Sequence, residues 1–261
     1  MNPSTSAQPL AWPFGRQFPL LTLLNPGRLG PAVAVSFALG LGVGWSAAHV
    51  LGFPFWSITA ITLLALLPVG VIKWRADLRR YGATIMLLSI ILVSQGVHTI
   101  EHIAQWAEYY ILFMPARQST GLLSAANSEW VHFVWNWAVL VIVLALMRGG
   151  MRNRWALLLL AVATAHTLEH TYMFVRYLEM LSELRQLKVF NVTAQGLPGI
   201  IGRDGWLARS PATQGTFICT LPGLTTAMRL DVHFWWNTLE MLLLLCAGSV
   251  FLRSRLNTLK S

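Results

Sequence analysis

Long apolar segments alternate with short polar stretches along the chain. A helix that crosses a bilayer needs about 17–25 mostly apolar residues. Six segments meet this length: residues 31–52, 55–72, 81–113, 129–147, 155–177 and 230–252. The pattern predicts an all-α integral membrane protein with six transmembrane helices. They form one transmembrane domain, 31–261, preceded by a cytoplasmic or interfacial segment, 1–30.

Basic residues cluster after every second apolar segment, in the stretches KWRADLRR, RGGMRNR and RSRLNTLK. If the segments cross alternately, all three stretches fall on one side of the membrane. Lys and Arg are concentrated in cytoplasmic loops. We therefore expect a cell-membrane protein with both termini in the cytoplasm, and with the connections 115–128 and 178–229 outside.

The composition supports a membrane protein, because 55% of the residues are hydrophobic and only 11% are charged. The formal net charge of +9 comes from Lys and Arg at the ends of apolar segments, and these residues form no single patch with interleaved aromatic side chains. This distribution predicts membrane lipid as a partner and excludes nucleic acid. In the first segment, Gly40, Gly42 and Gly44 predict close helix packing.

Two sequence patterns occur twice. HTIEH at 98–102 recurs as HTLEH at 166–170, and VHFVWN at 131–136 recurs as VHFWWN at 232–237. The first unit spans 81–148 and the second spans 155–253, and both begin and end on the cytoplasmic side. They therefore predict two parallel helical-hairpin repeats, related by a pseudo-twofold axis along the membrane normal, whose four helices form a bundle.

The spacing within these patterns places their polar side chains on one face of each helix, since positions i, i+3 and i+4 are neighbours. Tyr109 and Tyr177 follow eleven residues after the first histidine of each doublet, on the same face. All of these residues are expected at one level, in the outer half of the membrane. The predicted metal ligands are His98, Glu101, His102, His132, His166, Glu169, His170 and His233.

An ionisable side chain in the membrane interior costs about 2.5 kcal/mol or more, so its repetition indicates a function. Neutral imidazole and carboxylate ligands suit Zn, Fe, Cu or Mn. Six histidines and two glutamates exceed the three or four ligands of one ion, which favours two ions, Fe or Cu. Glu101 and Glu169 are predicted to bridge the ions, to orient an imidazole or to act as catalytic groups, and the two tyrosines to relay protons or electrons.

Glu240 breaks the repeat, because Val139 stands at the matching position of the first unit. A buried, unpaired carboxylate is costly, so we expect Glu240 to hydrogen-bond across the bundle or to pass protons to the site. Glu129 and Asp231 are expected to cap their helices.

Four functions are open on this pattern. The first is a dinuclear iron or copper oxidoreductase acting on a hydrophobic substrate from the bilayer, by chemical analogy with membrane desaturases and hydroxylases. The second is a b-type haem protein that transfers electrons. The third is a zinc hydrolase, because H-x-x-E-H is similar to the motif of inverted zincin proteases. The fourth is a non-catalytic subunit that packs against partners in a membrane complex.

Overall fold

The computed structural model describes residues 19–190 and 196–258, and the regular structure in these ranges is helical. The main helices are α2 (Pro19–Leu24), α3 (Gly30–Val50), α4 (Trp56–Tyr81), α5 (Ala83–Tyr110), α6 (Glu129–Arg148), α7 (Arg154–Gln186), α8 (Trp206–Arg209) and α9 (Arg229–Thr258). Short 3-10 turns lie at Gly27–Leu29, Ser124–Asn127 and Phe217–Thr220.

Five of the described helices are long and apolar enough to cross a membrane: α3, α4, α5, α6 and α9. The sixth predicted span, 155–177, lies in α7 but does not reach the same apolarity, because its apolar first half ends at the polar stretch HTLEH. The prediction of an all-helical protein of membrane type is confirmed.

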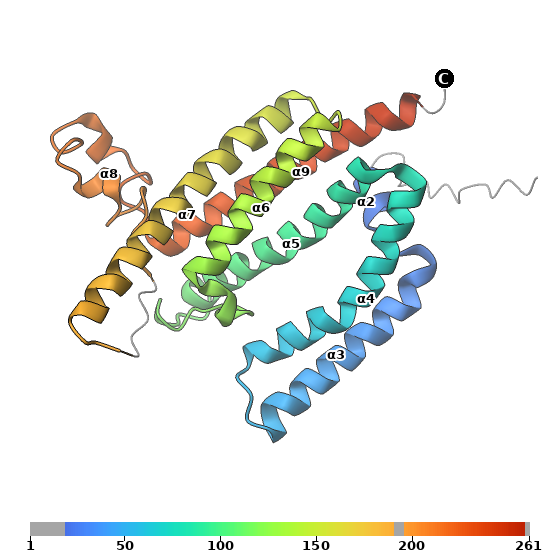
Figure 1. Ribbon diagram of the computed structural model, residues 1–261, viewed down its shortest axis with the longest axis horizontal. Coiled ribbons are helices and arrows are strands. Elements are labelled where there is room, and N and C mark those ends of the chain that lie inside the picture. The colour runs from blue at the N-terminus through green and yellow to red at the C-terminus, as the bar shows by residue number, and fades with distance from the viewer. Residues whose placement is uncertain (1–18, 191–195, 259–261) are drawn as a thin grey trace, which may run out of the picture.

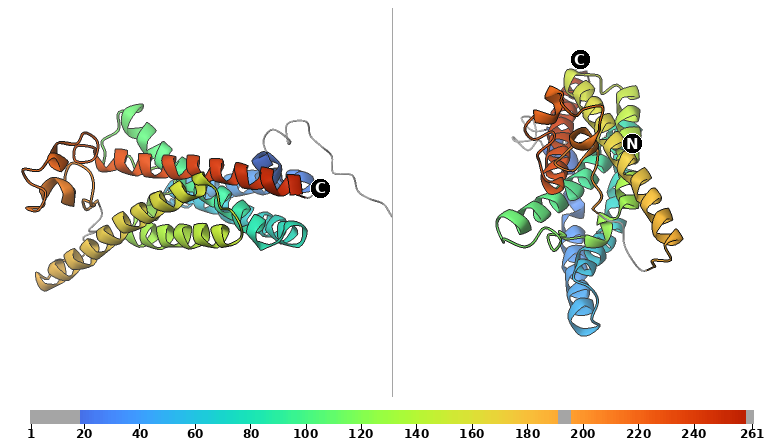
Figure 2. Two further views of the ribbon diagram at one scale, coloured as in Figure 1. Left: turned by 90° about the horizontal axis from the view of Figure 1, so that it is seen from above. Right: turned by 90° about the vertical axis from the view of Figure 1, so that its left-hand side faces the viewer.

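α5, α6, α7 and α9 pack as a bundle, while α3 and α4 form a hairpin beside it (Figure 1). Within the bundle, α5 contacts α9, α6 contacts α7, and α7 also contacts α9, as the two further views show (Figure 2). The helices that carry HTIEH and HTLEH therefore each lie against a helix that begins with VHF.

The α3–α4 hairpin depends on small residues. A Cβ added at Gly40 would lie 2.7 Å from the Cα of Thr62, and one at Gly44 would lie 2.8 Å from the Cα of Ile58. These two glycines confirm the prediction of close packing, whereas a Cβ at Gly42 would meet open space. The backbones of α3 and α4 approach each other because Gly40 and Gly44 lack side chains.

The interior of the bundle differs between its two ends. One end is aliphatic, with a core that includes Leu88, Ile91, Leu92, Val143, Leu146, Leu159, Leu244 and Ala247. α2 covers this end, where Leu20 and Leu23 are buried against α9 and α5. The other end contains the buried histidines, so the candidate site lies at one end of the bundle.

Candidate metal centre

Six histidines from all four bundle helices meet at the polar end. α5 contributes His98 and His102, α7 contributes His166 and His170, and the first turns of α6 and α9 contribute His132 and His233. Neighbouring rings lie with their centroids 4.7–5.8 Å apart. His98 is half-buried and the other five are buried. The structure thus brings together the six histidines that the sequence singles out.

One nitrogen each of His98, His102 and His132 lies within 4.8 Å of the others, so this group could hold a metal ion. The Nε2 atoms of five of the six histidines are buried and have no hydrogen-bond partner: those of His98, His102, His166, His170 and His233. A buried polar atom without a partner costs about 1–3 kcal/mol. Metal binding would supply the missing partners, so the donor set fits metal ions.

Three histidines are held through their other ring nitrogen. The Nδ1 of His102 lies 3.0 Å from Gln105 Oε1, that of His132 lies 3.2 Å from the Ser128 carbonyl oxygen, and that of His166 lies 3.0 Å from Glu240 Oε1. Each oxygen accepts, so Nδ1 carries the proton and Nε2 keeps its lone pair. Metal-binding histidines are oriented in this way by the groups around them.

Glu101 and Glu169 are bound to the backbone of the connections that follow their helices. The carboxylate of Glu101 accepts the N–H of Leu122 at 2.8 Å and that of Leu123 at 2.9 Å. That of Glu169 accepts the N–H of Ile200 at 3.0 Å and that of Ile201 at 3.3 Å. Each carboxylate therefore fixes the backbone of the connection after its helix. Its hydrogen bonds come from that backbone rather than from a histidine.

A glycine precedes each of these amide pairs. A Cβ added at Gly121 would collide with the Glu101 carboxylate, and one at Gly199 would collide with the Glu169 carboxylate. The triplets Gly121-Leu122-Leu123 and Gly199-Ile200-Ile201 thus both bind a carboxylate through two amides, although Gly121 has a positive φ of 72° and Gly199 does not. Sequence reasoning missed them, although a glycine followed by two aliphatic residues in each connection is a readable signal.

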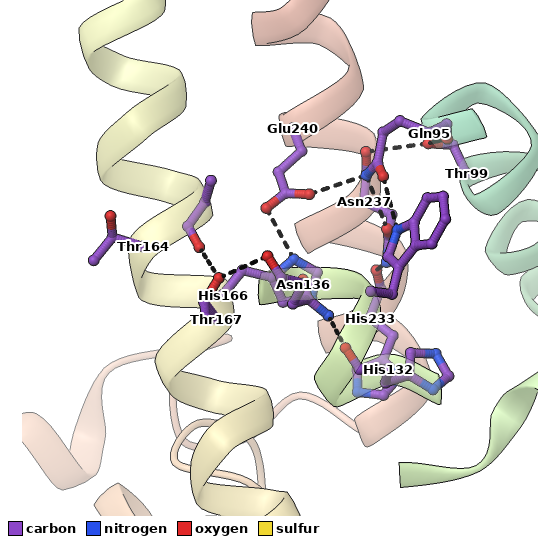
Figure 3. A network of polar contacts seen from close by, with 12 residues as sticks. Gln95, Thr99, His132, Asn136, Thr164, His166, Thr167, His233, Asn237 and Glu240 are labelled. Carbon is purple, nitrogen blue, oxygen red and sulfur yellow. Dashed lines mark hydrogen bonds and ion pairs between the residues drawn. The ribbon is translucent and has the colours of Figure 1, made fainter. Parts of the chain in front are cut away.

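A polar network lies on the aliphatic side of the histidines (Figure 3). Gln95 Nε2 donates to Glu240 Oε2 at 3.0 Å, and Trp135 Nε1 donates to Gln95 Oε1 at 3.0 Å. The expected hydrogen bond of Glu240 across the bundle is therefore present. Gln95 is a further residue that sequence reasoning missed, because a single buried glutamine in an apolar helix has no spacing that marks it.

Several contacts occur twice, at matching positions of the two units. Thr99 Oγ1 donates to the Asn237 carbonyl oxygen at 3.5 Å, and Thr167 Oγ1 donates to that of Asn136 at 3.2 Å. The asparagine side chains donate to the carbonyl oxygens of their own helices, at His132 and His233. The asparagines are thereby engaged in the backbone rather than with the imidazoles.

The ring contacts are also paired between the units. Trp106 stacks on Phe234 with centroids 5.3 Å apart, and Phe174 stacks on Phe133 with centroids 4.4 Å apart. In each pair, one ring comes from a helix with an HTxEH pattern and the other from a helix that begins with VHF.

The two tyrosines have partners other than the histidines of the cluster. The Tyr109 hydroxyl donates to Met228 Sδ at 3.8 Å, and the Tyr177 ring stacks on Phe174. His49 lies outside the cluster, in the α3–α4 hairpin, where its ring contacts those of Trp45 and Phe55.

The expectation that Glu129 caps α6 is wrong. Ser128 is the N-cap, and its side chain accepts the N–H of Val131 at 3.4 Å. Glu129 is buried and instead pairs with Arg229 at 2.7 Å, which joins the first turns of α6 and α9. Arg229 also donates to the Leu197 carbonyl oxygen. Asp231 accepts a hydrogen bond from the Tyr110 hydroxyl at 3.0 Å.

Comparisons with protein-family models, with curated proteins and with solved structures find no match to this chain. The class of the protein is therefore defined by the fold and the site alone. The chain is a helical protein of membrane type with a buried histidine cluster that could bind metal.

Proposed function

We propose that this protein is an integral membrane oxidoreductase whose six clustered histidines hold two metal ions. The observation that carries the proposal is the convergence of buried Nε2 atoms without partners from α5, α7 and α9, around the His132 ring of α6. A buried imidazole that only packs the core satisfies its nitrogens with nearby hydrogen bonds. Here one nitrogen in each of five histidines is left for a ligand.

Two ions fit this donor set better than one. A single ion takes three or four protein ligands. His98, His102 and His132 form one compact group of donors. The remaining three histidines are also neighbours, with ring centroids 4.9 Å apart for His166 and His170 and 5.1 Å apart for His170 and His233. We assign three histidines to each ion.

The donor set favours copper over iron. Di-iron centres in helical bundles use glutamate ligands together with histidine. Here the carboxylates of Glu101 and Glu169 are engaged by backbone amides, which leaves neutral imidazoles as the donors. Imidazole is a good ligand for copper, and neutral donors suit an ion of low charge. When bound, a copper pair would supply one-electron and two-electron redox chemistry.

The other two cofactor functions fit the geometry less well. A haem needs a flat slot between its axial histidines, but the six rings lie against one another and against Trp135 and Trp236. A zinc hydrolase needs a carboxylate free to act as a base on the metal-bound water. The glutamates of both HTxEH patterns accept backbone hydrogen bonds instead.

We further propose that α7 is the sixth transmembrane helix and that the two units form a pseudo-twofold bundle. The paired contacts of the two units support this arrangement, since each of them joins the same two positions of the repeat. The buried polar residues of α7 face the bundle, which makes the helix less apolar without exposing it to lipid. The basic clusters favour an orientation with the site toward the outer face, where a hydrophobic substrate would arrive from the bilayer.

The test is the metal content and absorption spectrum of the protein purified in detergent. We expect two copper ions per chain, and no Soret band. The variants H98A and H166A should each lose metal, while H49A, which removes a histidine outside the cluster, should retain both ions. A stoichiometric single zinc, a Soret band or the absence of bound metal would each overturn the proposal.

A further inference from the structure

The two halves of the histidine cluster differ at one buried carboxylate. Glu240 is 1% exposed, and its carboxylate accepts a hydrogen bond from His166, whose side chain is fully buried. In the first unit, Val139 occupies the matching position and is also buried. A buried carboxylate is costly in an apolar bundle, so its presence in one unit alone requires a specific role.

Both oxygens of Glu240 are used. Oε1 accepts from His166 Nδ1 and Oε2 accepts from Gln95 Nε2, each at 3.0 Å. Gln95 in turn accepts from Trp135, whose ring lies 5.2 Å from that of His98. A continuous hydrogen-bonded unit thus runs from a histidine of the second repeat to a ring packed on a histidine of the first.

The matching positions of the two repeats do not form a second copy of this network. Ala163 stands where the first repeat has Gln95, and Trp236 stands where it has Trp135. The Trp236 ring stacks on His166 at 5.2 Å, as Trp135 lies against His98, but its buried Nε1 has no hydrogen-bond partner. The hydrogen-bonded network is therefore present once between two otherwise similar halves. Its carboxylate, Glu240, contacts a histidine of the second half, His166.

We infer that Glu240 is a positioning residue that makes the two metal positions unequal. The inference rests on the proposed two-metal centre. A carboxylate that accepts from Nδ1 fixes the imidazole with Nε2 toward the metal and increases its basicity as a ligand. The anionic partner also stabilises a higher charge on the ion bound by His166. The position held by His166 therefore binds its ion more tightly and has the lower reduction potential of the two.

The experiment compares the wild type with Glu240→Gln in detergent, using copper alone as the probe. Loss of a carboxylate that hydrogen-bonds to a metal-binding histidine weakens metal binding by about 10–100-fold. We expect E240Q to lower the affinity for one of the two copper ions by this factor and to leave the affinity for the other unchanged. The two reduction potentials should also come closer together. H166A should lose the same ion that E240Q weakens, and H98A should lose the other.

Two variants separate positioning from a general effect on folding. Glu240→Asp retains a carboxylate and should restore part of the difference between the two reduction potentials. If Glu240 only fills space, E240D should lose this difference as E240Q does, because its side chain is smaller. Glu129→Gln removes a buried carboxylate that pairs with Arg229 instead of a histidine, and should keep both ions.

The outcomes are distinct. If the wild type binds two copper ions and E240Q lowers the affinity for both equally, or for neither, the inference is overturned but the proposed function is not. A wild type without stoichiometric copper overturns the proposed function and the inference together.

Discussion

Glu101 and Glu169 show how a charged residue at a metal-binding spacing serves the architecture around the site. Each carboxylate is buried beside the histidines and takes two backbone N–H groups from the connection that follows its helix. These charge-assisted bonds compensate for burial of the carboxylate. The connections are thereby fixed over the polar end of the bundle.

At this scale, we predict that Gly199→Ala destabilises the protein. The added methyl group would collide with the Glu169 carboxylate and break its bonds to Ile200 and Ile201. Hydrogen bonds to a charged group contribute about 1.5–3 kcal/mol each, so a loss of about 2 kcal/mol is expected. The measurement is the free energy of unfolding in detergent.

The matched control is Gly42→Ala, because a Cβ at Gly42 meets open space within α3. Alanine is favoured over glycine inside a helix by about 1 kcal/mol, so this variant should be neutral or slightly more stable. Equal stability of G199A and the wild type would contradict the role assigned to the Glu169 bonds.

The histidines of the site and the supporting residue Glu240 could be predicted from sequence, whereas Gln95 could not. HTxEH and VHFxWN repeat at helical spacing, and charge is rare around them, so the six histidines are visible without a structure. Gln95 acquires its role only when helices pack, because a hydrogen bond between distant positions leaves no local pattern. Glu129 was assigned to capping for the same reason, since its partner Arg229 lies on another helix.

At the scale of the elements, apolar length predicts the helices well and their ends less well. The third segment was expected to extend to residue 113, but α5 ends at Tyr110. α7 continues to Gln186, beyond the predicted end at 177, because residues 178–186 favour helix although they are too polar for a span. Hydrophobicity therefore predicts which part of a helix lies in the membrane, while the backbone follows helix propensity further.

The α3–α4 hairpin contributes no histidine to the cluster, so its packing and metal binding are separable. Gly40→Leu would place a bulky side chain against the backbone of α4 and separate the two helices. We predict that G40L lowers the melting temperature but that the protein which remains folded binds as much metal as the wild type. Thermal unfolding and metal analysis of the same samples test this. Loss of metal in proportion to stability would show that the hairpin supports the site.

At the scale of the whole molecule, we predict the orientation of the protein in the membrane from the positions of its basic clusters. Positive residues lie in the connection between α6 and α7 and near the end of α9, and we expect these parts in the cytoplasm. Gln214 lies in the long connection before α9 and is exposed, as is Arg152 in the connection between α6 and α7. The two positions should lie on opposite sides of the membrane.

A labelling experiment tests this orientation. In a background with Cys219→Ser and Cys246→Ser, Q214C should react with a membrane-impermeant maleimide in intact cells. R152C should react only after the membrane is permeabilised. The reverse pattern would place the histidine cluster toward the cytoplasm and contradict the proposed topology.

The central claim is that six imidazoles hold two copper ions, and X-ray absorption at the copper edge tests it most directly. We expect a shell of nitrogen neighbours at about 2.0 Å, with the multiple scattering of imidazole, because carboxylates and thiolates are outside the donor set. H49A should give the spectrum of the wild type. A copper shell without imidazole scattering, or a wild-type spectrum in a protein lacking both His98 and His166, would contradict it.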